Sequence, residues 1–166
     1  MDIFIEDFLS ADDRVNLFEW SESVFPAEGR GFTWAKPTHH VVARENGSAI
    51  AHIGFAAFTI IHETELPVIG VGGVVVRPEH QGKNIPSILF ETLHAATTLD
   101  VRNSISTLFC PQRLIPYYEK QGYQEHQQGF RFLQDGNYVE TSQFQLMVRG
   151  CPVRWNRTVS IPSNPW

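Results

Sequence analysis

The chain has 166 residues, enough for one domain with a hydrophobic core and too few for two domains of ordinary size. Its hydrophobic content of 42% is typical of a globular protein, and its net charge of −5 argues against a nucleic-acid-binding face. No stretch approaches the roughly 20 apolar residues of a membrane-spanning helix. We therefore expect a single domain, residues 1–166, with neither nucleic acid nor membrane as a partner.

The N-terminal sequence "MDIFIEDFLS" carries acids where a secretory signal would carry bases. The two cysteines, Cys110 and Cys151, are too few for a disulfide framework. Both observations predict a cytoplasmic protein. The acidic balance of the chain also weakly favours a small cationic substrate.

The first elements expected are a strand over residues 2–8 and a helix that runs to about residue 25. Ser10 as N-cap, with Asp13 three residues later, forms an acidic variant of the capping box. The segment "PAEGRGFTWAKPT", residues 26–38, contains two prolines and two glycines and therefore predicts a loop. A long loop inside a compact domain is often functional.

The middle of the chain predicts a hairpin over residues 39–61, because Asn46-Gly47 is typical of the primed turns that match strand twist. A further strand ends near residue 76. Its three glycines, at positions 70, 72 and 73, predict a bulge or the close approach of another chain segment or a ligand.

Helical spacing of apolar residues predicts a helix over residues 85–100, and the continuous apolar run 104–110 predicts a buried strand parallel to the preceding one. A second helix follows, with Gly122 at its C′ position. The segment "QDGNY" predicts a hairpin turn, residues 143–149 a late strand, and residues 151–166 an extended tail. Helices on both faces of a mixed sheet are the simplest packing of these elements.

The stretch "VVVRPEHQGKNIPSILF", residues 74–90, joins a strand to a helix through a short polar loop. The first N–H groups of a helix are unpaired and carry a partial positive charge, so such a loop suits a phosphate, with Lys83 adding charge nearby. Spacing alone favours the simpler alternative, an ordinary strand-to-helix turn.

This stretch resembles the acetyl-CoA motif of the GNAT superfamily of N-acetyltransferases, which runs strand, Gln/Arg-x-x-Gly-x-Gly/Ala, helix. Gln81 takes the first position, and "LIPYYEKQGY" is similar to the Tyr-x-x-x-Gly-Phe/Tyr segment of the family, giving Tyr118 and Gly122. Two residues depart from the pattern. Asn84 stands where glycine is preferred but tolerates left-handed dihedrals, and Pro86 has no N–H to offer a phosphate.

The resemblance implies an α+β fold, layered α/β/α, with a mixed, mostly antiparallel sheet, a central parallel strand pair that splays apart, and flanking helices. It implies acetyl-CoA as co-substrate, with pantetheine pairing to the backbone between the splayed strands and the pyrophosphate over residues 81–87. The cofactor-binding residues are then Val74, Val76, Gln81, Gly82, Lys83, Asn84, Ile85, Pro86 and Ser87.

The reaction implied is direct attack of a primary amine on the thioester, without a metal ion. Tyr118 is the expected proton donor to the leaving thiolate, and the adjacent Tyr117 the expected core residue. The proton acceptor stays open between four candidates, each with an alternative interpretation as a surface or satisfied residue: Glu28, Glu63, Glu65 and His52. A desolvated cleft or a water relay is the alternative to all four. We interpret Cys110 as a small buried apolar residue, since direct transfer needs no acyl-enzyme.

Within the superfamily the chain is most similar to aminoglycoside 2′-N-acetyltransferases and, more distantly, to nodulation N-acyltransferases, through "AHIGF", "VVVRPEHQGK" and a final tryptophan. This implies a small-molecule amine at a site that the tail helps to form, with Trp166 contributing its ring and terminal carboxylate. Glu28 and Trp34 of the early loop are further substrate-site candidates, and Trp34 can equally be an anchor of its loop. Gly72 replaces an acidic residue of that group, which argues against an antibiotic acceptor. A homodimer is possible. The rival functions are a CoA-binding sensor without turnover and a structural domain without CoA.

Overall fold

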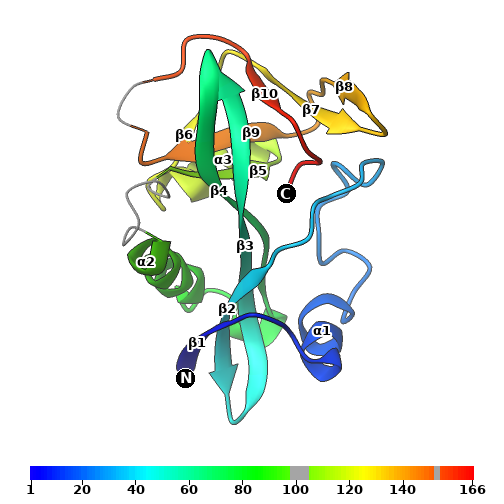
Figure 1. Ribbon diagram of the computed structural model, residues 1–166. Coiled ribbons are helices and arrows are strands. Elements are labelled where there is room, and N and C mark those ends of the chain that lie inside the picture. The colour runs from blue at the N-terminus through cyan, green and yellow to red at the C-terminus, as the bar shows by residue number, and fades with distance from the viewer. Residues whose placement is uncertain (98–104, 152–153) are drawn as a thin grey trace.

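The computed structural model describes residues 1–97, 105–151 and 154–166. Its described strands form one mixed sheet of ten, in which β3 and β4 are the long central pair (Figure 1). The order along the sheet is β6-β9-β5-β4-β3-β10-β7-β8, and β2 and β1 extend it beside the first half of β3. The strands are β1 (Asp2–Glu6), β2 (His39–Glu45), β3 (Ser48–His62), β4 (Thr64–Val76), β5 (Ser106–Cys110), β6 (Gln124–Glu125), β7 (Phe130–Gln134), β8 (Asn137–Val139), β9 (Gln145–Arg149) and β10 (Val159–Ile161).

Helices cover both faces of this sheet, as the sequence predicts. In β2, Val42 packs in the cluster beneath α1, whereas its neighbours Val41 and Ala43 pack in the cluster beneath α2. Figure 1 places α1 and α2 on opposite sides of the central strands. The helices are α1 (Ala11–Phe18), α2 (Ile85–Thr97) and α3 (Ile115–Glu119), with short 3₁₀ turns η1 (Pro78–His80) and η3 (Gln112–Leu114).

The predicted fold class is confirmed. Most strand pairs are antiparallel, while β4 with β5 and β10 with β7 are parallel. The predicted helix 85–100 corresponds to α2, and residues 98–104, which include the end of that helix and the start of the strand 104–110, lie outside the described residues. Of the helices in the described part of the chain, none is both long enough and apolar enough to cross a bilayer.

The capping box of α1 is confirmed, but its predicted length is wrong. Ser10 and Asp13 exchange side-chain and backbone hydrogen bonds at the start of the helix. The helix then ends at Phe18 rather than near residue 25. The indole of Trp20 donates to the carbonyl of Leu17, and the hydroxyls of two following serines bond locally, so side chains replace the backbone bonds of a further turn.

Two β-bulges shape the centre of the sheet. The turn at Asn46-Gly47 has positive φ at both residues, as predicted, but the β2–β3 register shifts between Ala43 and Arg44. A second shift lies between β3 and β4, where Gly73 has a φ of 60°. The prediction that the glycines of β4 mark a bulge is therefore confirmed, and so is the predicted turn in "QDGNY", which joins β7 to β8.

The C-terminal tail is more ordered than predicted. Part of it forms β10, which is inserted between β3 and β7, and its last residue, Trp166, is buried. The second predicted helix is shorter than expected. It ends at Glu119 with Lys120 as C-cap, so Gly122, predicted at C′, lies one residue beyond that position; it has a φ of 84° and donates its N–H to the Glu119 carbonyl.

Candidate active site

The parallel strands β4 and β5 separate after a short ladder. They pair only at Ile69–Val71 with Ser106–Leu108 in the described residues, while the other edge of β4 stays paired with β3 as far as Val76. The backbone of β4 from Gly72 onward therefore has one edge that no described strand covers. This separation agrees with the predicted splay, and it places the predicted coenzyme residues Val74 and Val76 on the uncovered stretch.

The loop that follows β4 is exposed and has the predicted backbone geometry. Gly82 and Asn84 have φ values of 76° and 57°, so Asn84 does adopt the left-handed conformation in place of glycine. The side chain of Gln81, however, donates to the Val76 carbonyl at 3.1 Å and ties the loop back to the strand. The carbonyl of Val76, one of the two residues whose backbone is predicted to pair with pantetheine, thus already accepts one hydrogen bond within the chain.

The first turn of α2 has backbone N–H groups that no described side chain caps. The Asn84 side chain accepts from the Ser87 hydroxyl at 2.8 Å, and that hydroxyl also accepts from Gln121 at 3.0 Å. No described side chain caps the N–H groups of Ile85 or Ser87, and Pro86 lacks one. Two backbone donors and the exposed Lys83 therefore suit an anionic group, with one donor fewer than a non-proline residue would give.

A cavity of about 490 Å³ lies on the other face of the sheet, beside α1. The alternation of β3 shows this, because Phe55 packs in the cluster beneath α2, whereas its neighbours Gly54 and Ala56 line the cavity. We call this cavity the aromatic pocket. Its aromatic lining residues come from α1, the segment that follows it, the 26–38 loop, β3, β5, the segment before β9 and the tail: Phe18, Phe25, Phe32, Trp34, Phe58, Phe109, Phe144 and Trp166.

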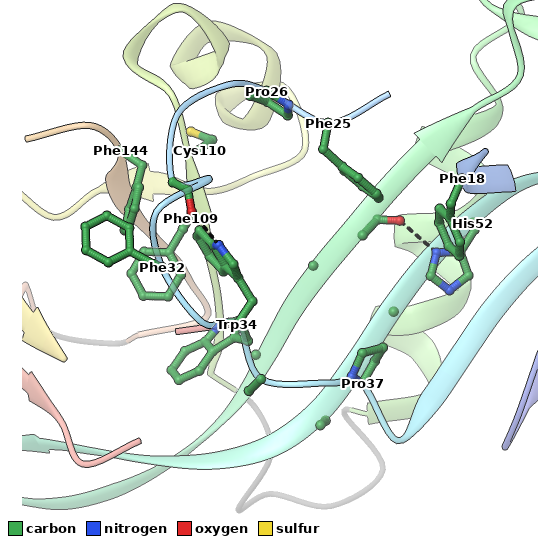
Figure 2. A pocket seen from close by; sticks show the side chains of 18 of the residues that line it. Phe18, Phe25, Pro26, Phe32, Trp34, Pro37, His52, Phe109, Cys110 and Phe144 are labelled. Atoms are coloured by element: carbon green, nitrogen blue, oxygen red, sulfur yellow. Dashed lines mark hydrogen bonds between the residues drawn. The ribbon is translucent and has the colours of Figure 1, made fainter. Parts of the chain in front are cut away.

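Figure 2 shows these side chains in two groups. Trp34, Phe32, Phe109 and Phe144 gather at one end of the aromatic pocket, and Phe18 and Phe25 lie with His52 at the other. The indole of Trp34 donates to the Gly29 carbonyl at 2.9 Å, a bond that the figure also draws. The predicted loop residue Trp34 is thus held by its own loop with its ring in the pocket.

Trp166 closes the pocket at the sheet. Its indole N–H donates to the Thr107 carbonyl at 3.1 Å, and its ring stacks on Phe58 with centroids 4.3 Å apart. A Cβ on Gly70 would lie 2.5 Å from this ring, so the glycine is required by the close approach of the tail. The sequence thus placed Trp34 and Trp166 in one site, although their role in binding an acceptor stays a prediction.

The carboxylate candidates for proton acceptor are poorly placed for that role. Glu28 lines the aromatic pocket, but both its oxygens pair with Arg113, and this pairing lowers the pKa of Glu28. Glu63 and Glu65 are exposed residues at the β3–β4 turn and do not line the pocket; Glu63 pairs with Arg157 at 3.4 Å. Of the four candidates, His52 alone remains a neutral base in the pocket.

His52 belongs to a hydrogen-bonded pair that sequence reasoning missed. Its Nδ1 lies 2.7 Å from the Gly73 carbonyl, which can only accept, so Nδ1 carries the proton (Figure 2). Its Nε2, 2.8 Å from Nδ1 of His40, must then accept a hydrogen bond from the Nδ1–H of that ring. The Nε2 of His40 has no partner among the described residues and is not fully buried, so the accepting end of the pair is His40 Nε2.

Both imidazoles are neutral at pH 7. Burial lowers the pKa of His52 to about 4, and burial together with the charge of Arg14 lowers the pKa of His40 below its ordinary value. His40 and His52 both line the aromatic pocket. A neutral imidazole with an open nitrogen is a suitable acceptor for an ammonium proton.

The expectation for the two adjacent tyrosines is wrong in one respect. Tyr118 is the buried one, at 7% exposure among Phe90, Cys110 and Tyr123, whereas Tyr117 is half-buried. Burial raises the pKa of Tyr118, so it stays protonated at any working pH, as a proton donor must. Tyr118 itself does not line the aromatic pocket.

Cys110 is buried as predicted, and it lines the aromatic pocket at the end of β5. Burial raises the pKa of its thiol to about 12. The thiolate form is therefore absent at neutral pH, which agrees with its interpretation as a packing residue rather than a nucleophile.

Two solved structures that are similar to this chain over most of its length are described as acyltransferases. The chain is similar to an acyl-CoA N-acyltransferase from Pseudomonas aeruginosa, with 20% identity, a TM-score of 0.56, and 89% of this chain and 98% of that one covered. It is also similar to a GNAT family N-acetyltransferase from Escherichia coli in complex with CoA, with 18% identity, a TM-score of 0.53, and coverages of 76% and 68%. At these identities the likeness concerns the fold.

The family is shown by the sequence itself. Residues 36–125 match the model of the acetyltransferase (GNAT) domain. This chain belongs to the GNAT acetyltransferase family. Among curated proteins, none matches it at a significant level.

Proposed function

We propose that this chain transfers an acetyl or related acyl group from acetyl-CoA to the primary amine of a small molecule by direct attack. One observation carries the proposal. β4 and β5 stop pairing after Val71 and Leu108, with the donor-bearing start of α2 toward one face and the aromatic pocket on the other. Two substrates entering from opposite faces would meet where the strands separate.

The residues present fit the coenzyme. The uncovered edge of β4 around Val74 offers backbone groups to an amide-containing chain such as pantetheine. The N–H groups of Ile85 and Ser87, with Lys83 beside them, suit the pyrophosphate. A CoA complex of a family member in Escherichia coli supports this assignment.

In the proposed reaction the acceptor nitrogen forms a bond to the acyl carbon while the carbon–sulfur bond breaks. An amine near pKa ~10 must lose a proton, at a cost of roughly 4 kcal/mol at pH 7. We assign this proton to His40 Nε2, directly or through one water, with His52 fixing the tautomer. The departing sulfur takes its proton from the hydroxyl of Tyr118.

The test compares Tyr118→Phe with the matched control Tyr117→Phe. We expect Tyr118→Phe to lower kcat by about 100-fold or more, the usual size of a general-acid effect, while calorimetry still detects coenzyme binding. Tyr117→Phe should retain most of the activity. Equal activity of the two variants would remove Tyr118 from the mechanism without removing the transferase.

The sensor remains the second candidate, because Pro86 withdraws one N–H from the pyrophosphate site. Turnover is tested on a broad panel of amines by measuring the release of thiol. Coenzyme binding without turnover of any of these amines would favour the sensor. Absence of any heat on titration with acetyl-CoA would contradict both candidates. A cytoplasmic location and a homodimer stay part of the proposal, and size-exclusion chromatography with light scattering tests the latter.

A further inference from the structure

The aromatic pocket limits what the acceptor of the proposed function can be. Its wall includes eight phenylalanine and tryptophan side chains, and some of their rings are in edge-to-face contact, such as Phe32 with Phe144 and Trp34 with Phe109. A polar body with many hydroxyl or ammonium groups would lose water there and find few hydrogen-bond partners among the rings. An aromatic or other apolar body would gain burial and ring contacts.

The charged residues that line the pocket indicate which charge an acceptor should carry. The lining side chains include two arginines, Arg14 and Arg30, and one carboxylate, Glu28, which is already neutralised by Arg113; the main-chain carboxyl group of Trp166 lies beside Gly72. Arg30 donates to the carbonyl of Glu22, a contact that leaves its charge uncompensated. The side chains that line the pocket therefore carry an excess of positive charge, with Arg14 and Arg30 against the single carboxyl group of Trp166.

Of the two arginines, Arg14 is the better candidate to bind an anionic group of the acceptor. The acids nearest to it in the sequence and on β1, Asp13 and Glu6, are both engaged by Arg44, at 2.8 Å and 2.9 Å. No described carboxylate pairs with Arg14, which projects from α1 into the pocket lining. Its charge reaches the reacting end of the pocket, because it contributes to the lowered pKa of both His40 and His52.

We infer that the acceptor is an aromatic or similarly apolar amine that carries a carboxylate, held by Arg14 with its body among the rings of the aromatic pocket. This rests on the proposed function and narrows its substrate class. It also reverses the expectation drawn from the net charge of −5. That charge describes the whole surface, whereas the local excess of arginine disfavours a polycation, an aminoglycoside included.

The experiment uses pairs of probes that differ in one group. With acetyl-CoA as donor, kcat/KM is measured on L-phenylalanine, on phenethylamine, which lacks only the carboxylate, and on the polycations spermidine and kanamycin. We expect phenylalanine to be preferred over phenethylamine and both polycations to be poor. In Arg14→Gln, kcat/KM on phenylalanine should fall by about 10-fold or more, while phenethylamine changes little. Arg157→Gln, an exposed arginine outside the pocket, should change neither.

Each outcome supports or overturns the inferred acceptor. Equal turnover of phenylalanine and phenethylamine, or an equal effect of Arg14→Gln on both, would overturn the carboxylate assignment. Preference for spermidine or kanamycin would overturn the inference entirely, as would no turnover of any of the four amines by a protein that binds coenzyme. Failure to bind coenzyme in calorimetry would instead overturn the proposed function, so the two failures are distinguishable.

Discussion

The two halves of the site are built in different ways. The coenzyme half lies along one contiguous stretch, from the uncovered edge of β4 through the exposed loop to the first turn of α2. The acceptor half, the aromatic pocket, collects side chains from α1, an early loop, three strands and the tail (Figure 2). Local sequence determines the first half, and tertiary packing determines the second.

This difference explains which substitutions each half can tolerate. Backbone donors at a helix start depend on dihedrals more than on side chains, so a departure such as Asn84 is absorbed without change of shape. The aromatic pocket consists of side chains, and one substitution there alters its size or charge. We expect changes in the acceptor half to alter acceptor turnover while leaving coenzyme affinity intact.

The largest expected effect is that of His40→Gln. It removes the proposed proton acceptor, so kcat/KM at pH 7 should fall about 100-fold or more. The loss should shrink as the pH approaches the pKa of the amine, because the solvent then deprotonates the acceptor. Since the pKa of His40 lies below 6.5, the wild-type protein should keep its base in the active form above that pH and lose activity as the pH falls through the His40 pKa. A pH profile of kcat/KM for both proteins measures this.

The adjacent His39 provides the control. It is exposed, bonds to Thr38 and stacks on Phe55, so His39→Gln should retain activity. Coenzyme affinity should be unchanged in both variants. A loss in His40→Gln that persists at high pH would indicate a structural role, and equal losses in the two variants would remove His40 from the mechanism.

Gly70→Val tests whether the two halves are separable. The added side chain would meet the rings of Trp166 and Phe58 at 2.5 and 2.6 Å, and neither can shift without repacking the pocket. We expect a decrease of about 1–3 kcal/mol in the free energy of unfolding, as for other overpacked sites, together with loss of acceptor turnover. Denaturant unfolding and steady-state kinetics measure the two effects.

Gly31→Ala is the matched control, because its Cβ would have no neighbour within 4 Å and its φ is not positive. Coenzyme affinity should change less than about twofold in either variant, an allowance we take from the usual scatter between distant sites. If Gly70→Val weakened coenzyme binding as much as acceptor turnover, the two halves would form one coupled site.

The histidine pair shows why sequence could predict the coenzyme half better than the acceptor half. From the Asn46-Gly47 turn alone, an unbroken hairpin would pair His52 with Val41 and so place His39 on the face of His52. The bulge shifts the register so that His52 pairs with Val42, and His40 takes that face instead. Nothing local in the sequence fixes this bulge.

The tyrosines make the same point. α3 has only five residues, too few for a periodic pattern to decide which of Tyr117 and Tyr118 faces the core. The motif selected Tyr118 by spacing to Gly122, while the burial of Tyr118 depends on Phe90 of α2, a contact between two elements. In contrast, the left-handed Asn84 and the start of α2 followed from neighbouring residues alone.

The smallest expected effect concerns the coenzyme half, in Pro86→Ala. The substitution supplies the N–H that proline lacks in the first turn of α2, so acetyl-CoA should bind about 3-fold to 10-fold more tightly, as one further hydrogen bond of about 1 kcal/mol allows. Stability should move the other way, by less than about 1 kcal/mol, because proline restricts the unfolded chain. Calorimetry and thermal unfolding measure the two opposite changes.

Pro116→Ala is the control for this substitution, since Pro116 occupies the first turn of α3 and is exposed. It should lose a similar amount of stability with no gain in coenzyme affinity. If Pro86→Ala behaves like Pro116→Ala, the pyrophosphate does not lie over the start of α2.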